Sequence, residues 1–122
     1  MAKILIVDDS RTSRKILHGI LEEAGHEVVA EATNGEEGYL KYKELKPELV
    51  TMDITMPVMD GLEALKLIKR DENAKVIMIT SAGQKEKMME AVKYGADEFI
   101  TKPFADKDVV KAVKDVLDRN AD

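Results

Sequence analysis

Short apolar runs of strand length alternate with amphipathic segments of helix length along the whole chain. The apolar runs are five in number and lie at residues 3–7, 27–32, 49–52, 76–79 and 98–100. After each run, apolar residues recur three or four positions apart, which is the period of an α-helix. Strict alternation of this kind predicts five βα units and therefore a parallel sheet with helices on both faces.

The helical segments carry recognisable start and stop signals. Gly25 and Gly95 are placed to end the first and fourth helices, and Pro47 breaks the second. The segment Thr33-Asn34-Gly35-Glu36 has the spacing of a capping box, which predicts the start of the second helix. Gly38 interrupts that helix, at a cost of about 1 kcal/mol relative to Ala. The residues predicted to face the sheet are Ile16, Leu17, Ile20, Leu21, Ala24, Leu62, Leu65, Ile68, Met88, Met89, Ala91, Val92, Val109, Val113, Val116 and Leu117.

The strands differ in composition, and the difference predicts their order. Residues 3–7, 49–52 and 76–79 are apolar almost throughout, as expected of strands covered on both faces. Residues 27–32 and 98–100 are shorter or diluted with charge, which favours the edges of the sheet. We therefore predict a doubly wound α/β fold of the flavodoxin-like type, with strand order 2-1-3-4-5 and five helices. A length of 122 residues predicts one domain spanning residues 1–122.

Composition excludes several function classes. The net charge of -5 and the aromatic content of 4% argue against nucleic-acid binding, because no basic stripe or stacking surface is available. The chain has no cysteine, which excludes disulfides, thiolate zinc sites and a cysteine nucleophile. No leader or membrane-length apolar run is visible, so we expect a cytoplasmic protein without membrane contact. His18 and His26 lack a third ligand nearby in the sequence and are expected on the surface.

Polar residues follow the predicted strands at the points where these strands end. Asp8 and Asp9 come directly after the first strand, Asp53 after the third, and Thr80 after the fourth. Lys102 follows the fifth strand. In an open α/β sheet the site lies beyond the carboxyl ends of the strands, where the strand order reverses. The topology therefore predicts that three acids, a hydroxyl and an ammonium converge there.

Three carboxylates in one pocket repel one another. At an effective dielectric constant near 20, each pair about 4 Å apart costs about 4 kcal/mol. A hard divalent cation offsets this repulsion, and Mg²⁺ suits a site with one or two carboxylates and several waters. Taken singly, the segment Asp8-Asp9-Ser10 is typical of a helix N-cap, and Asp53 is typical of a turn. The placement of all these residues at strand ends of one sheet favours a cation-binding functional site instead.

The sequence resembles the receiver domains of bacterial two-component response regulators, of the stand-alone chemotaxis type. The resemblance covers essentially the whole chain. The motifs that carry it are Ile6-Val7-Asp8-Asp9-Ser10, Met52-Asp53-Ile54-Thr55-Met56-Pro57-Val58-Met59-Asp60-Gly61, Thr80-Ser81-Ala82, Gly95-Ala96 and Lys102-Pro103-Phe104.

The resemblance implies a phosphorylation site and its metal ligands. Asp53 matches the aspartate that accepts the phosphoryl group. Asp8 and Asp9 match the acidic pair that organises Mg²⁺, with Mn²⁺ as an alternative ion. Thr55 matches the position whose backbone carbonyl completes the protein ligands. These four residues are the expected metal site of the chain.

The resemblance also implies a switch. Lys102 matches the lysine that pairs with the phosphoryl group, and Thr80 matches the switch hydroxyl. Phe99 matches the aromatic switch position. Phosphorylation is expected to change the surface built from the fourth helix, fifth strand and fifth helix, where Met88, Met89, Lys93 and Tyr94 lie. The family's Lys102–Pro103 bond is expected in the cis form.

The implied function is signalling rather than metabolic catalysis. We expect a histidine kinase to donate the phosphoryl group and the monomeric protein to catalyse its own phosphorylation and dephosphorylation. A downstream protein, such as the flagellar motor switch, and a phosphatase are the further partners that the resemblance suggests. Motor binding, a relay intermediate and a phosphate sink remain open as roles.

Two other classes share parts of this pattern. A phosphatase of the haloacid dehalogenase class uses an aspartate nucleophile after a strand, but needs a second acid two residues on, where this chain has Thr55. A flavodoxin-like carrier needs a phosphate-binding loop after the first strand, where Asp8 and Asp9 would repel a flavin phosphate. Turnover of phosphate esters would favour the first class, and a coloured purified protein the second.

Overall fold

The computed structural model describes residues 1–119 and consists of five strands and five helices that alternate along the chain. The strands are β1 (Lys3–Val7), β2 (Glu27–Ala32), β3 (Leu49–Asp53), β4 (Val76–Thr80) and β5 (Glu98–Thr101). The helices are α1 (Arg11–Glu23), α2 (Gly35–Leu45), α3 (Gly61–Ile68), α4 (Lys85–Lys93) and α5 (Asp106–Arg119). The predicted α/β class is confirmed.

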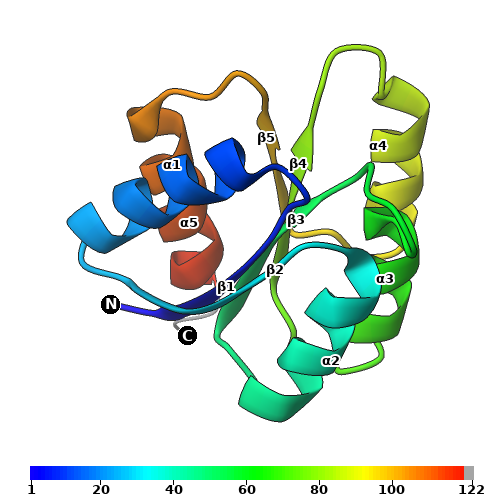
Figure 1. Ribbon diagram of the computed structural model, residues 1–122, viewed down its shortest axis with the longest axis horizontal. Coiled ribbons are helices and arrows are strands. Elements are labelled where there is room, and N and C mark those ends of the chain that lie inside the picture. The colour runs from blue at the N-terminus through cyan, green and yellow to red at the C-terminus, as the bar shows by residue number, and fades with distance from the viewer. Residues whose placement is uncertain (120–122) are drawn as a thin grey trace.

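The strands form one parallel sheet in the order β2-β1-β3-β4-β5, as predicted. Helices α1 and α5 lie on one face of the sheet, and α2, α3 and α4 on the other (Figure 1). All residues of β3 and β4 are buried, whereas β2 and β5 at the edges are only partly so. Both faces of the central strands are covered, which explains their continuous apolar character.

Two separate cores follow from the alternation of side chains along the strands. Leu5, Val50 and Met78 face α2, α3 and α4, while Ile4 and Ile77 belong to the core under α1 and α5. Successive residues of a strand point to opposite faces, so one apolar run supplies both cores. The sheet is thereby held from two sides, and the ends of its strands have fixed relative positions.

The structure corrects the predicted cap of the second helix. The N-cap of α2 is Asn34, whose side chain accepts a hydrogen bond from the Glu37 N–H at 2.9 Å. Glu37, not Glu36, reaches back to the N–H of Thr33. Gly38 is explained by packing, because a Cβ there would lie 2.8 Å from Cγ2 of Val7. Glycine is needed at this position of the helix because the Val7 side chain of β1 leaves no room for a Cβ.

Four apolar residues predicted to face the sheet are in fact exposed, and one of them is Ala24, the C-cap of α1. Ile16 on α1 is 49% exposed, and Met89 and Val92 on α4 are each 58% exposed. Of the helix α4 stripe, only Ala91 is buried. A helical period of apolar residues marks one side of a helix but cannot show how much of it the sheet covers.

The loops that follow β1, β3, β4 and β5 emerge at the same edge of the sheet (Figure 1). The peptide bond between Lys102 and Pro103, in the loop after β5, is cis as expected. Within residues 1–119, no helix is long and apolar enough to cross a membrane.

Candidate metal centre

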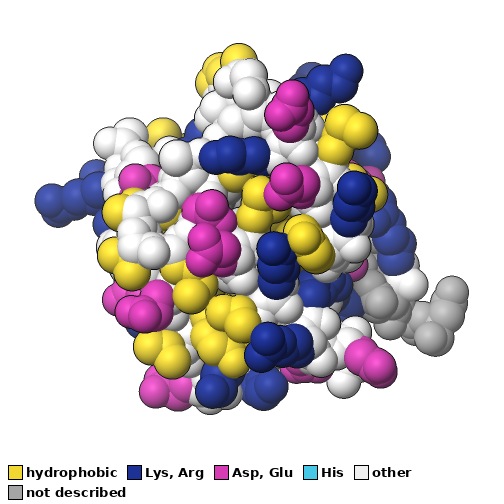
Figure 2. Space-filling view, turned by 90° about the vertical axis from the view of Figure 1, so that its right-hand side faces the viewer, with side chains coloured by type: hydrophobic (Ala, Val, Ile, Leu, Met, Phe, Trp, Pro, Cys, Tyr) yellow, Lys and Arg dark blue, Asp and Glu magenta, His cyan; other side chains and the backbone are white. Residues whose placement is uncertain are grey.

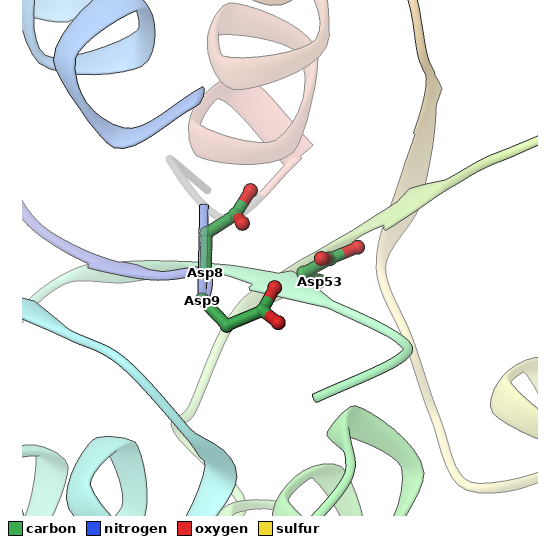
Figure 3. A group of neighbouring side chains, drawn as sticks. All are labelled: Asp8, Asp9 and Asp53. Carbon is green, nitrogen blue, oxygen red and sulfur yellow. The ribbon is translucent and has the colours of Figure 1, made fainter. Parts of the chain in front are cut away.

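Three carboxylates gather where the sheet topology predicts them. Asp8 and Asp9 follow β1, Asp53 is the last residue of β3, and β1 pairs directly with β3. A carboxylate oxygen of each lies within 4.8 Å of one from the other two. The side chains extend from the strand ends to the same side (Figure 3). Asp8 is fully buried and Asp53 is 6% exposed, whereas Asp9 is exposed.

Asp8 is held rigidly by its surroundings. Its N–H donates to the Ala32 carbonyl at 3.0 Å, and its Oδ1 accepts from the Ser10 N–H at 2.8 Å. Ser10 is in turn the N-cap of α1, so the capping interpretation of this segment is confirmed at Ser10, and the same segment also contributes two acids to the cluster. The other carboxylate oxygen of Asp8, Oδ2, is buried and has no hydrogen bond. The cation that reaches that oxygen is the Lys102 ammonium.

Lys102 is the cation that the structure itself brings to the acids. Its Nζ lies 3.1 Å from Oδ2 of Asp8 and 3.5 Å from Oδ2 of Asp53. Burial raises the pKa of the Asp53 carboxyl to about 6; the negative charges of Asp8 and Asp9 add to this effect, and Lys102 opposes it. One ammonium therefore does not balance three acids, and the cluster retains a deficit of positive charge.

The donor set fits a hard divalent ion. All the candidate ligands in the cluster are carboxylate oxygens, which suit Mg²⁺ and Mn²⁺ rather than softer metals. The buried Oδ2 of Asp8 has no hydrogen bond, and burial of such a charged atom is offset here by the Lys102 ammonium at 3.1 Å, which a divalent ion would have to displace or share. The exposure of Asp9 leaves the cluster open on one side, so water ligands have access.

The remaining predicted residues lie on the neighbouring strand ends and loops. Thr80, 4% exposed, ends β4, and the Lys102 N–H donates to its carbonyl at 2.7 Å. Thr55 is exposed in the loop between β3 and α3. Phe99 on β5 is half-buried and packs against the core under α2, α3 and α4. All the predicted site residues except Phe99 therefore come from the carboxyl edge of the sheet.

Two residues near the site escaped the sequence analysis. Arg14 on α1 donates from Nη1 to the Asp8 carbonyl at 2.8 Å. Gln84 donates from Nε2 to the Thr55 hydroxyl at 2.7 Å and accepts from the Ser81 N–H. A signal for Arg14 was present: cations are unfavourable near a helix N-terminus, and an arginine placed there suggests a nearby acidic partner. No comparable signal marks Gln84.

The histidines lie outside the acidic cluster and are half-buried rather than fully on the surface. His18 Nδ1 lies 2.7 Å from Oε2 of Glu31, and His26 Nδ1 accepts from the Ala2 N–H at 3.0 Å. Burial and the nearby N-terminal ammonium lower the pKa of His26. Each ring is thus satisfied by local partners.

Comparison with known proteins identifies the class to which this fold and site belong. Residues 4–114 match the family model of the response regulator receiver domain, and the chain belongs to this family. Among its relatives is the chemotaxis protein CheY of Thermotoga maritima, 51% identical over 115 residues, which are 93% of this chain and 96% of the relative. The chemotaxis protein CheY of Halobacterium salinarum is 54% identical over 119 residues, covering 96% and 98% of the two chains.

A solved structure supports the same assignment. A chain of the CheX–CheY–BeF₃–Mg²⁺ complex from Borrelia burgdorferi superimposes with a TM-score of 0.89 at 38% identity, covering 94% of this chain and 88% of that one. This chain is therefore a CheY-like receiver domain of two-component signalling. Receiver domains bind Mg²⁺ at an acidic pocket, and phosphorylation and partner binding are general in the family.

Proposed function

We propose that this protein is a single-domain phospho-switch, spanning residues 1–122, that accepts a phosphoryl group on Asp53 from a histidine kinase. The observation that carries the proposal is the position of the Asp53 carboxylate. It lies at the end of a central strand, within 4.8 Å of two other acids and 3.5 Å from the Lys102 ammonium. It is nearly buried, at 6% exposed. The family membership and the CheY relatives support a role in chemotaxis.

The transfer exchanges one bond to phosphorus for another. A carboxylate oxygen of Asp53 forms a bond to phosphorus while the P–N bond of the phosphohistidine breaks. The imidazole nitrogen keeps that electron pair and takes a proton from solvent. Such transition states are loose, so the protein contributes mainly position and charge. Lys102 faces Oδ2 of Asp53 and would pair with the oxygens of the incoming phosphoryl group.

Asp8, Asp9, Asp53 and the backbone carbonyl of Thr55 would hold Mg²⁺, or Mn²⁺ in its place. When bound, the ion neutralises negative charge on the transferred group and on the acids. The Ile54 N–H donates to Oδ1 of Asp53 at 3.0 Å and thereby sets the plane of this carboxylate. Hydrolysis of the resulting acyl phosphate ends the signal, which makes the protein a signalling component with self-catalysed steps.

The response is proposed to pass through Thr80 and Phe99. A phosphoryl group on Asp53 offers the Thr80 hydroxyl a charged acceptor, and the half-buried Phe99 would follow as Thr80 moves. The surface of α4, β5 and α5 would change as a result. On the side of the molecule where α3 and α4 lie, hydrophobic side chains are interspersed with charges of both signs (Figure 2). The exposed Met89 and Val92 of α4 suit a cytoplasmic protein partner such as the flagellar motor switch.

A phosphorylation assay tests the proposal. The protein is incubated with Mg²⁺ and acetyl phosphate, and its mass is followed alongside those of Asp53→Asn and Asp118→Asn. Asp118 is an exposed carboxylate on α5 and serves as the matched control. We expect a phosphate-sized mass gain in the wild type and in Asp118→Asn, and none in Asp53→Asn. No gain in the wild type, or an equal gain in Asp53→Asn, would refute the proposal.

A further inference from the structure

We propose that Arg14 is a positioning residue for the metal site, because it fixes the peptide unit from which the Asp9 carboxylate projects. The inference rests on the proposed function in one respect, namely that Asp8, Asp9 and Asp53 hold a divalent cation. Within residues 1–119, the side-chain hydrogen bonds of Arg14 go to the Asp8 carbonyl and to Glu31, not to a carboxylate of the cluster. Arg14 acts on the backbone between the two acids.

The guanidinium of Arg14 joins the acidic loop to the edge of the sheet. Its Nη1 donates to the Asp8 carbonyl oxygen at 2.8 Å, and its Nε pairs with Oε1 of Glu31 at 3.2 Å. The side chain is only 15% exposed, so solvent replaces these contacts poorly. A planar fork held at two points has little rotational freedom, which a single flexible ammonium cannot reproduce.

The partner of Arg14 is also fixed. Glu31 lies on β2, paired with Ile6 of β1, and its second oxygen lies 2.7 Å from Nδ1 of His18. Lys41 donates to the Glu31 carbonyl at 2.7 Å. The Arg14 side chain is thus held against a strand that runs beside β1.

The consequence for Asp9 follows from peptide planarity. The Asp8 carbonyl and the Asp9 N–H belong to one rigid plane, so the bond from Arg14 fixes the direction in which residue 9 begins. The Asp8 carboxylate has its own contacts with Ser10 and Lys102. Within residues 1–119, the Asp9 carboxylate has no hydrogen bond or ion pair of its own. Its aim into the cluster (Figure 3) therefore depends on the backbone that Arg14 holds.

Positioning and electrostatics predict opposite effects of removing Arg14. Arg14 is a cation close to an acidic site, so loss of its charge alone would tighten the binding of a divalent ion. If Arg14 sets the geometry, its loss instead weakens binding, because Asp9 is no longer held in place. Residues that orient metal ligands typically contribute about 10–100-fold in affinity. The sign of the change therefore separates the two roles.

The experiment titrates Mg²⁺ into four proteins and monitors binding through their amide chemical shifts. The proteins are the wild type, Arg14→Gln, Arg14→Lys and Arg11→Gln. Arg11 is an exposed cation on the same helix and is the matched control for lost charge. We expect Arg14→Gln to weaken Mg²⁺ binding by about tenfold or more and Arg11→Gln to leave it unchanged or slightly tighter. Thermal unfolding in EDTA confirms that each variant is folded.

The variant Arg14→Lys keeps the charge, so a change in its affinity cannot come from lost charge; we expect weaker binding there too. Unchanged or tighter binding in folded Arg14→Gln overturns the inference, as does wild-type affinity in Arg14→Lys if Arg14→Gln does not fold. Absence of Mg²⁺ binding in the wild type would instead count against the proposed metal site itself.

Discussion

The Lys102 ammonium lies closer to Asp8 than to Asp53, the residue that it is proposed to serve: Nζ is 3.1 Å from Oδ2 of Asp8 and 3.5 Å from Oδ2 of Asp53. It therefore bridges two of the three acids and competes with any other cation for the same oxygens. Two opposing roles follow. Lys102 should disfavour a divalent ion in the site and should favour a phosphoryl group once one is present.

Replacing Lys102 by Met keeps the apolar stem of the side chain and removes its charge. We expect Mg²⁺ to bind about tenfold more tightly, because a tenfold change corresponds to only about 1.4 kcal/mol, well within the repulsion between nearby charges. Phosphorylation by acetyl phosphate should nevertheless become slower. Titration calorimetry and mass spectrometry measure the two effects, with the exposed Lys107→Met as control. Weaker Mg²⁺ binding in Lys102→Met would contradict this account.

The ionisation of Asp53 should destabilise the fold in metal-free buffer. Its pKa is raised from 3.8 to about 6, mainly by burial, so the folded protein binds the proton more tightly than the unfolded chain. The loss of stability caused by ionised Asp53 is fully present above pH 6. It disappears below pH 3.8, the pKa of this carboxyl in the unfolded chain. A tenfold change in proton affinity is about 1.4 kcal/mol, so the cost at neutral pH is on the order of 2–3 kcal/mol.

Asp53→Asn, which cannot ionise, should therefore have a higher free energy of unfolding than the wild type by about 2 kcal/mol at pH 7 in EDTA. The difference should shrink as the pH falls from 6 and vanish near pH 4, as urea unfolding at each pH would show. A difference independent of pH would point to altered packing around residue 53 rather than to its charge.

Gly61 allows the backbone of α3 to approach Asp53 closely. Its N–H donates to the Ile54 carbonyl at 2.7 Å, and a Cβ would overlap the Asp53 carbonyl oxygen and lie 2.9 Å from the Asp53 carbonyl carbon. Gly61→Ala should therefore destabilise the protein by about 2–4 kcal/mol and slow phosphorylation, since the peptide after Asp53 must move. Thermal unfolding and the mass assay measure both effects.

Gly19 provides the contrasting substitution. It lies within α1, and a Cβ there would have nothing within 4 Å. Gly19→Ala should stabilise the protein by about 0.5–1 kcal/mol, because Ala restricts the unfolded chain and favours the helix. Similar losses of stability in the Gly19 and Gly61 variants would show that the close approach at Gly61 is not the cause.

Gln84 links the loop after β3 to the loop after β4, through the Thr55 hydroxyl and the Ser81 N–H. Gln84→Ala should loosen the loop after β4, and the Ser81 amide should exchange with deuterium several times faster, because it loses its acceptor. Thr55→Val removes the hydroxyl and leaves the Ser81 bond in place. In this variant the exchange rate of the Ser81 amide should change less. If the Ser81 amide were equally protected from exchange in Gln84→Ala and Thr55→Val, the result would argue against the link.

The predicted architecture depended on properties that are local in the chain. Hydrophobic period separates strands from helices, and the continuous apolar character of residues 49–52 and 76–79 indicates strands covered on both faces. Strand ends at Asp8, Asp53 and Thr80 then imply one common edge of the sheet, as the structure confirms.

The sequence by itself therefore determined the α/β class, the strand order and the acids at the carboxyl edge, because each is encoded in a short stretch of residues. Only the tertiary structure decided which other side chains hold the backbone and the loops around those acids. Arg14 meets Glu31 across α1 and β2, and Gln84 meets Thr55 across two loops. Such contacts join residues far apart in the chain, and their distances depend on how the helices pack, which no local pattern records.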